Sequence, residues 1–303
     1  MAATCPYCGG EDLVVAFRDV RHKVDRSFGP FDLFACRDCG SLGTCTPPSA
    51  ERLAAFYADY DALRPDWYAA AARDSALEPQ YAFYARTIAR RAAHERGRWI
   101  DIGAGHGEVA TRLRDALPGW TGTAIDIGPR PARLAADVAY HERDLNRSDW
   151  TDGFAGRYDL VFSVAVWEHV LDPASFARDC LSLVAPGGRL VLVTPDSGSL
   201  AFRVLRRRWP YFEPGEHVSI PTRAGAIAAL RRAATSLGYG EDALKLAARP
   251  LNVGYSVRYL LEVLRLSALG RLLPPNLAAP LPTGILIAEA SRGAAREPVT
   301  RSE

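Results

Sequence analysis

Two Cys-x-x-Cys pairs near the N-terminus have the spacing of a metal site. Cys5 and Cys8 form the first pair, Cys36 and Cys39 form the second, a glycine follows each pair, and 27 residues separate Cys8 from Cys36. Two such turns can present four thiolates in a tetrahedron, the arrangement that structural zinc prefers. Four protein ligands leave no open coordination position, so a catalytic or redox role is the less favoured alternative. The sequence therefore predicts a structural zinc site within residues 1–46.

Two histidines and a glutamate are candidates for acid–base chemistry. Glu168 and His169 follow an apolar stretch, and His217 lies in an aromatic, proline-rich loop. An imidazole titrates near neutral pH and can take a proton from an attacking hydroxyl group. A purely structural hydrogen-bonding role stays open for both histidines, and we expect His217, before His169, to be the general base. The basic segment 203–208 before this loop is either a solvated surface or a contact for an anionic acceptor.

Three glycines follow a short apolar run that has the character of a buried strand. Gly103, Gly105 and Gly107 are spaced two apart after Asp101, and a helical apolar pattern comes next. Glycines permit positive φ and let a ligand lie against bare backbone, and the N-terminus of the following helix attracts carboxylates or phosphates. The dinucleotide fingerprint would need its third glycine at position 108, where this chain has Glu108. A carboxylate before the loop would also repel a pyrophosphate.

With its Asp101, Gly103, Gly105 and Gly107, this loop resembles the first motif of the class I S-adenosylmethionine (SAM)-dependent methyltransferases, commonly D-x-G-x-G-x-G. The resemblance implies SAM as the cofactor, with its methionine part held by the glycine loop. It also implies an α/β fold with a Rossmann-like seven-stranded sheet in the order 3-2-1-4-5-7-6, in which the last strand is antiparallel.

Further cofactor contacts are expected after the next strands. Asp126 ends the predicted second strand, where a carboxylate can accept hydrogen bonds from both ribose hydroxyls, although capping of a helix that opens at Pro129 is the alternative. The resemblance implies that Asp144 binds the adenine amino group and that the next residue packs on the ring. Residues 163–169 should line the pocket, because ligands in such sheets lie beyond the carboxyl ends of the strands. The expected cofactor contacts are Asp101, Gly103, Gly105, Gly107, Asp126, Ile127, Asp144, Leu145 and Ser163.

Two further segments extend the resemblance and indicate the reaction. Glu168, His169 and Val170 match the E-x-x-E-H-V segment of quinone and small-molecule O-methyltransferases, but Ala165 replaces its first glutamate, which argues against metal-assisted catechol chemistry. The run W-x-x-x-x-P-x-x-H-V, which contains His217, resembles methyltransferases that carry an N-terminal zinc ribbon and are often encoded with surface-polysaccharide and modified-sugar pathways. We therefore expect O-methylation of a sugar, glycan or related small metabolite. C- or N-methylation of a natural-product intermediate and a non-catalytic zinc-ribbon scaffold are the alternatives.

Composition limits the partners. The chain has 303 residues, 48% of them hydrophobic, and its 37 basic and 35 acidic residues leave a net charge of +2. This balance gives no reason to expect nucleic-acid binding. We see no secretory signal before Cys5 and no apolar run long enough to span a membrane, so we expect the cytoplasm. The oligomeric state stays open.

The periodicities place these residues on a simple series of units. We expect a zinc ribbon over 1–46, a helical connector and lid over 47–97, a methyltransferase domain over 98–292 and a flexible tail over 293–303. Within the connector, a helix with Tyr81 and Tyr84 in the core should end at Gly97. An amphipathic helix over 254–269 should cover the substrate mouth, with weak membrane-surface contact as the alternative. Strands are expected at 13–17, 31–35, 98–102, 121–127, 138–145, 158–166, 189–193, 243–248 and 284–290.

Overall fold

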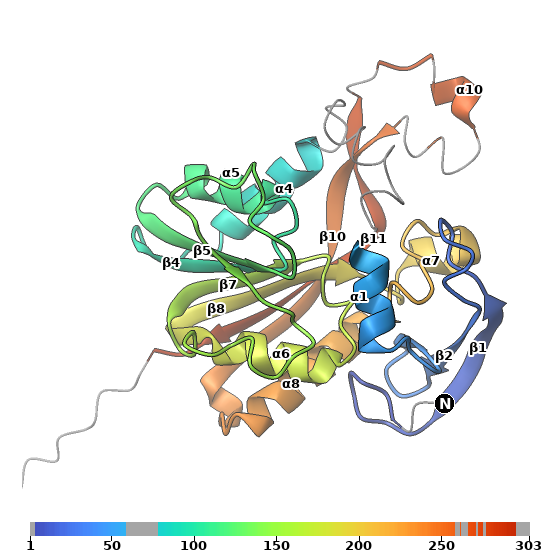
Figure 1. Cartoon of the computed structure of the whole chain (residues 1–303), viewed down its shortest axis with the longest axis horizontal. Coiled ribbons are helices and arrows are strands. Elements are labelled where there is room, and N and C mark those ends of the chain that lie inside the picture. The colour runs from blue at the N-terminus through green and yellow to red at the C-terminus, as the bar shows by residue number, and fades with distance from the viewer. Residues whose placement is uncertain are drawn as a thin grey trace, which may run out of the picture.

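The computed structural model describes residues 4–58, 78–257, 261, 266–270, 272–274 and 277–294. Its larger sheet has seven strands in the order β10-β11-β8-β7-β4-β5-β6, and β11 runs antiparallel to both of its neighbours (Figure 1). Numbered along the chain, this is the expected order 3-2-1-4-5-7-6, which is thereby confirmed together with the fold class. The strands are β4 (Gly97–Ile102), β5 (Trp120–Asp126), β6 (Ala139–Glu142), β7 (Tyr158–Val164), β8 (Val184–Pro195), β10 (Leu244–Ser256) and β11 (Ala278–Arg292).

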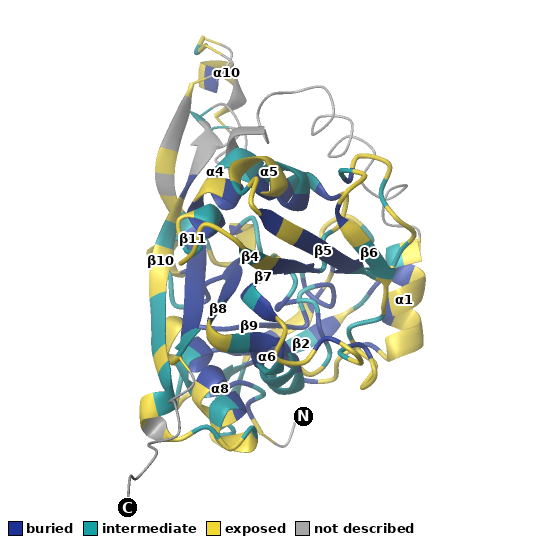
Figure 2. Cartoon of the chain, turned by 90° about the vertical axis from the view of Figure 1, so that its left-hand side faces the viewer, coloured by how far each residue is buried: buried dark blue, intermediate teal, exposed yellow. Residues whose placement is uncertain are grey.

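Helices cover both faces of this sheet. The helices α4 (Glu78–Ala89) and α5 (Glu108–Ala116) lie on one face, and α6 (Pro173–Ser182) and α8 (Arg223–Ser236) lie on the other (Figure 1). Successive side chains of β4 point to opposite faces of the sheet, and both faces are apolar. Trp99 packs in the core under α4 and α5, whereas Ile100 packs in the core under α6 and α8. The central strands are accordingly buried along most of their length (Figure 2).

A second, four-stranded sheet is formed mainly by the N-terminal residues. Its order is β1-β2-β3-β9, and each neighbouring pair is antiparallel. The two predicted strands are present, and two short strands that the sequence did not indicate complete the sheet. The fourth strand comes from the segment after β8, so the small sheet is not built from the N-terminal residues alone. Its strands are β1 (Leu13–Val20), β2 (Phe31–Cys36), β3 (Leu42–Thr44) and β9 (Ser219–Ile220).

A third hydrophobic core joins the small sheet to the segment between β8 and β9. Phe17 and Phe31 from the sheet and Phe56 from α1 (Ala50–Ala58) belong to it. They share this core with Phe202 of α7 (Leu200–Leu205) and with Trp209, which is fully buried. The aromatic, proline-rich loop that contains His217 is therefore fixed against the N-terminal sheet by aromatic packing.

Two predicted helix boundaries are wrong. The helix expected to end at Gly97 ends at Ala89, and Gly97 opens β4, where an added Cβ would lie 2.8 Å from the Trp120 ring. This glycine is required for close packing rather than as a helix stop. No helix opens at Pro129, because this stretch forms successive turns in which the Arg130 guanidinium donates to the carbonyl oxygens of Ala135 and Val138.

Several other expectations fall on parts of the chain that are only partly described. The amphipathic helix expected over 254–269 begins inside β10, which continues to Ser256, and most of the rest lies outside the described residues. The same applies to 59–77 of the connector and to 295–303 of the tail. No helix in the described part of the chain combines the length and the hydrophobicity that crossing a membrane requires.

Candidate functional site

The glycine loop joins β4 to α5 and adopts a backbone that requires its glycines. Gly103, Gly105 and Gly107 have φ values of 75°, 53° and 77°, in the left-handed region. An added Cβ at Gly103 would lie 2.3 Å from a methyl carbon of Val166, whereas at Gly105 it would meet no atom within 4 Å. The middle of the loop therefore faces open space next to the N-terminus of α5, where a ligand can approach the backbone.

Two aspartates lie at the carboxyl ends of the first two strands of the domain. Asp126 accepts hydrogen bonds from the Gly105 amide at 2.7 Å and from the Ile127 amide at 2.8 Å. Asp101 is buried, and burial, with the Asp126 charge as a second cause, raises its pKa well above the usual range. The helix-capping alternative for Asp126 is wrong, since no helix begins at Pro129 and the carboxylate is bound to the glycine loop instead.

The remaining expected cofactor contacts lie in two different settings. Asp144 and Leu145 follow β6 and are half-buried, and Asp144 accepts a hydrogen bond from the Asn146 amide at 2.9 Å. The backbone N–H of Arg143 donates to the carbonyl oxygen of Asp126, which holds this segment beside the end of β5. Ser163 is buried, and its hydroxyl donates to the carbonyl oxygen of Ile102, so it fixes β7 to the end of β4.

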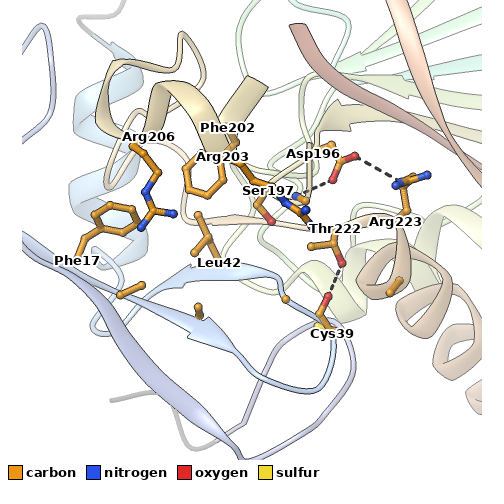
Figure 3. Close-up of a pocket in the computed structure, with 15 residues that line it drawn as sticks. Phe17, Cys39, Leu42, Asp196, Ser197, Phe202, Arg203, Arg206, Thr222 and Arg223 are labelled. Carbon is orange, nitrogen blue, oxygen red and sulfur yellow. Dashed lines mark hydrogen bonds and ion pairs between the residues drawn. The ribbon is translucent and has the colours of Figure 1, made fainter. Parts of the chain in front are cut away.

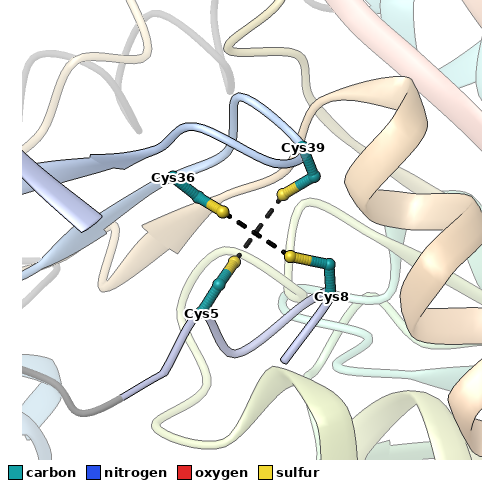
Figure 4. A group of neighbouring side chains, drawn as sticks. All are labelled: Cys5, Cys8, Cys36 and Cys39. Atoms are coloured by element: carbon teal, nitrogen blue, oxygen red, sulfur yellow. Dashed lines mark hydrogen bonds between the residues drawn. The ribbon is translucent and has the colours of Figure 1, made fainter. Parts of the chain in front are cut away.

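The four N-terminal cysteines meet in one cluster (Figure 4). The sulfur atoms of Cys5 and Cys39 are 3.7 Å apart and those of Cys8 and Cys36 are 3.5 Å apart. A tetrahedron with zinc–sulfur bonds of ~2.3 Å has edges of roughly 3.8 Å, so the cluster has the dimensions of a zinc site. The hydrogen bond from Cys5 lowers the pKa of the Cys39 thiol to about 5, which already favours one thiolate here.

The candidate acid–base residues also come together. The rings of His169 and His217 are perpendicular with centroids 4.6 Å apart, and Glu168 lies beside them. The Nδ1 atom of His217 is 2.7 Å from the carbonyl oxygen of Tyr211. Because a carbonyl oxygen only accepts, Nδ1 carries the proton and Nε2 keeps the lone pair that a general base needs. The Nδ1 atom of His169 lies 2.7 Å from the Tyr57 hydroxyl.

Glu168 is buried at the end of a strained turn. It follows Ala165, whose φ of 56° is unusual for a residue with a side chain, and it accepts a hydrogen bond from the Thr194 hydroxyl at 2.8 Å. Burial raises the pKa of Glu168 to about 8, and the charge of Glu216 adds to this. The donor atoms of Glu168, His169 and His217 are close enough to hold a cation. Two imidazoles beside a carboxyl group are also groups that acid–base chemistry uses.

We expect the pKa of Glu168 to affect stability. From pH 4.5 to about 8 the folded protein holds a proton that the unfolded chain has lost, so the free energy of unfolding falls as the pH rises through this window. Glu168→Gln removes this titrating group. The free energy of unfolding, measured by urea unfolding, should then fall less steeply between pH 4.5 and about 8. Glu95→Gln at an exposed position serves as the control. An unchanged slope in the Glu168 variant would contradict the raised pKa.

Sequence reasoning did not identify a second buried group beside these residues. The Nε2 atom of His22, from the segment between β1 and β2, lies 2.9 Å from a carboxylate oxygen of Glu216 and 3.3 Å from one of Glu213. The other oxygen of Glu216 is 4.0 Å from Nδ1 of His169. Only the position of Glu216, next to His217, was a signal in the sequence, whereas nothing around His22 indicated its contact with residues almost 200 positions away.

Comparisons with known proteins agree with this geometry. A family model described as a methyltransferase domain matches residues 76–237, more than half of the chain. A ubiquinone biosynthesis O-methyltransferase from Pseudomonas aeruginosa (strain LESB58) is 30% identical over 154 residues, which are 48% of this chain and 64% of that protein. The chain thus spans less than two thirds of the length of this curated relative.

Solved structures show the same fold at low sequence identity. The Burkholderia thailandensis 1,6-didemethyltoxoflavin-N1-methyltransferase, solved with S-adenosylhomocysteine, has a TM-score of 0.50 and 15% identity, covering 85% of this chain and 96% of its own. A methyltransferase in a complex with the Haloferax volcanii activator Trm112 has a TM-score of 0.51 and 16% identity, covering 75% of this chain and 97% of its own.

Proposed function

Since the chain belongs to the methyltransferase domain family, we propose that it is an SAM-dependent methyltransferase whose glycine loop binds the methyl donor. The observation that carries this proposal is the loop itself. Its three glycines all have positive φ, and its middle faces open space at the N-terminus of α5. Asp126 is bound to the Gly105 amide, which places its carboxylate beside the loop, where a ribose would lie. Asp144 at the end of the neighbouring strand would hold the adenine.

The chain's own residues supply the rest of the chemistry. When bound, SAM provides a methyl group on a sulfonium, so the displacement needs little electrophilic help. His217 would remove the acceptor proton through Nε2, because its Nδ1–H is held by the Tyr211 carbonyl. His169, packed against that ring, would orient the acceptor, and Glu168 would keep its proton at neutral pH. Alignment of the acceptor hydroxyl is the main task that remains for the protein.

We propose a hydroxyl group of a sugar, glycan or related small metabolite as the acceptor. The matched curated relative is named as an O-methyltransferase, and a histidine base suits a hydroxyl. N-methylation is the second candidate, because a structural neighbour is named as an N1-methyltransferase. We further propose that the cysteine cluster holds structural zinc and that the protein works in the cytoplasm.

A titration with SAM tests the proposal, with Gly105→Ala as the informative variant. The added methyl group enters the open space above the loop, so we expect SAM to bind at least about tenfold more weakly while the fold persists. Gly156→Ala is the matched control, since its φ is also positive and its added Cβ also meets no atom within 4 Å. A folded wild-type chain that gives no heat with SAM would instead support the non-catalytic scaffold. Mass spectrometry of candidate acceptors incubated with SAM then identifies the product that gains one methylene.

A further inference from the structure

A cavity of about 670 Å³ lies between the small sheet and the methyltransferase domain (Figure 3). Phe17 and Leu42 line it from the small sheet, and Phe202 lines it from α7. The segment after β8 and the first residues of α8 close its other side. No residue of the glycine loop lines this cavity, so it is distinct from the proposed donor site. Its volume is in the range of small-molecule sites.

The polar lining of this cavity is mainly cationic. Arg203, Arg206 and Arg223 line it together with the carboxylate of Asp196 and with Cys39 of the four-cysteine cluster. The Nε atom of Arg223 is 3.7 Å from Asp196, whereas among the described residues neither Arg203 nor Arg206 has a carboxylate oxygen within 4 Å. Burial raises the pKa of Asp196, against the hydrogen bond from the Gly198 amide and the charges of Arg223 and Arg203. Two guanidinium groups therefore remain for a ligand.

The side chain of Arg206 is held in place before any ligand binds. The guanidinium carbon of Arg206 lies 5.2 Å from the centre of the Phe17 ring and 5.7 Å from that of Phe202. This cation–π contact holds the Arg206 guanidinium over the two aromatic rings and leaves its N–H groups for a hydrogen-bond acceptor. The backbone of Arg206 is strained, with a φ of 51°, a feature that clusters at functional sites.

The N-terminus of α8 also lines this cavity. Arg223 and Ala224 are the first two residues of this 14-residue helix, and both line the cavity. The Thr222 hydroxyl caps the amide of Gly225 at 3.0 Å, so the two preceding amides have no partner from the helix. The positive end of this helix dipole therefore also favours an anion in the cavity.

We propose that this cavity binds a small organic phosphate ester, with its phosphate at Arg203 and Arg206 and its apolar body against Phe17, Phe202 and Leu42. Guanidinium groups form forked hydrogen bonds that match phosphate oxygens, and the apolar floor explains a preference for an ester over inorganic phosphate. This inference goes beyond the proposed function, because it requires neither SAM binding nor methyl transfer.

Calorimetric titration of the full chain with phenyl phosphate and with phenol tests the proposal. We expect one saturable site for phenyl phosphate and none for phenol. The double variant Arg203→Gln/Arg206→Gln should weaken phenyl phosphate binding roughly a hundredfold, which is about tenfold for each charged contact. Arg208→Gln removes one charge from the same basic segment without lining the cavity, and it should change the affinity less than about twofold.

Three results would overturn the proposal. They are equal binding of phenol, an equal loss in the Arg208 variant, and binding seen only with vesicles that contain phosphatidic acid and not with the free ester. The unfolding temperature of each variant shows that it is folded. The SAM titration is independent of this site, so loss of the proposed activity and loss of phosphate binding are distinguishable.

Discussion

Removing the metal from the four-cysteine cluster is expected to unfold the small sheet and to stop turnover. Structural zinc contributes roughly 10–16 kcal/mol of binding free energy in small zinc domains, which is as large as the whole stability of an ordinary domain. Unfolding of the small sheet should also disturb His217. The amide of Thr44 in β3 donates to the carbonyl oxygen of Val218, the residue after His217. Tyr7, within the first cysteine turn, is also hydrogen-bonded to Ser219 at 2.9 Å.

The substitution Cys36→Ser and removal of the metal by a chelator should both unfold the small sheet and stop turnover. We expect one zinc per chain by elemental analysis of the untreated protein. After chelation we expect rapid proteolysis of residues 4–58 and loss of methyl transfer. Cys45→Ser is the matched control, since Cys45 is buried in the same region but lies outside the cluster. A metal-free protein with an unchanged unfolding temperature would show that the cysteines are not a structural site.

Replacement of His217 by alanine is expected to lower kcat by roughly 10²–10⁴-fold, the usual contribution of a general base. The affinity for SAM should stay within about twofold, because the histidine lies outside the glycine loop. Partial recovery of the rate by added imidazole would identify the missing group as a base rather than a packing element. Steady-state kinetics with the acceptor found by mass spectrometry measures both effects.

Two further variants make this result decisive. His94→Ala removes an exposed imidazole far from this cluster in the sequence and should leave kcat unchanged. If His169→Ala causes the larger loss, then His169 is the base and His217 only supports it. If the His217 variant loses SAM affinity and keeps kcat, His217 is neither the general base nor a support for His169.

Much of the larger sheet was predictable because its signals are local. The buried strand β4, which ends just before Gly103, has a strong apolar pattern, and the positive φ of all three loop glycines is what their spacing suggested. The strand order came from the resemblance and not from periodicity. The caps of α6 and α8 are local as well, since Asp172 and Thr222 accept hydrogen bonds from the first turn of the helix that each precedes.

The unpredicted parts depend on contacts between distant segments. The strands β3 and β9 have three and two residues, which is too short for any periodic signal. The contact of His22 with Glu216 joins residues 194 positions apart, and neither has a local motif that indicates the other. The cofactor contacts, the general base and the division into domains stay predictions.

The pairing of β3 with β9 also has a consequence for synthesis of the protein. The cysteines and β1 to β3 are translated first, and β9 follows only about 170 residues later, the separation of the bonded pair Thr44 and Val218. Until then the edge of β3 has no partner, and an open strand edge can pair with another nascent chain. Premature termination before Ser219 makes this exposure permanent, so such truncated products should aggregate on the ribosome or soon after release.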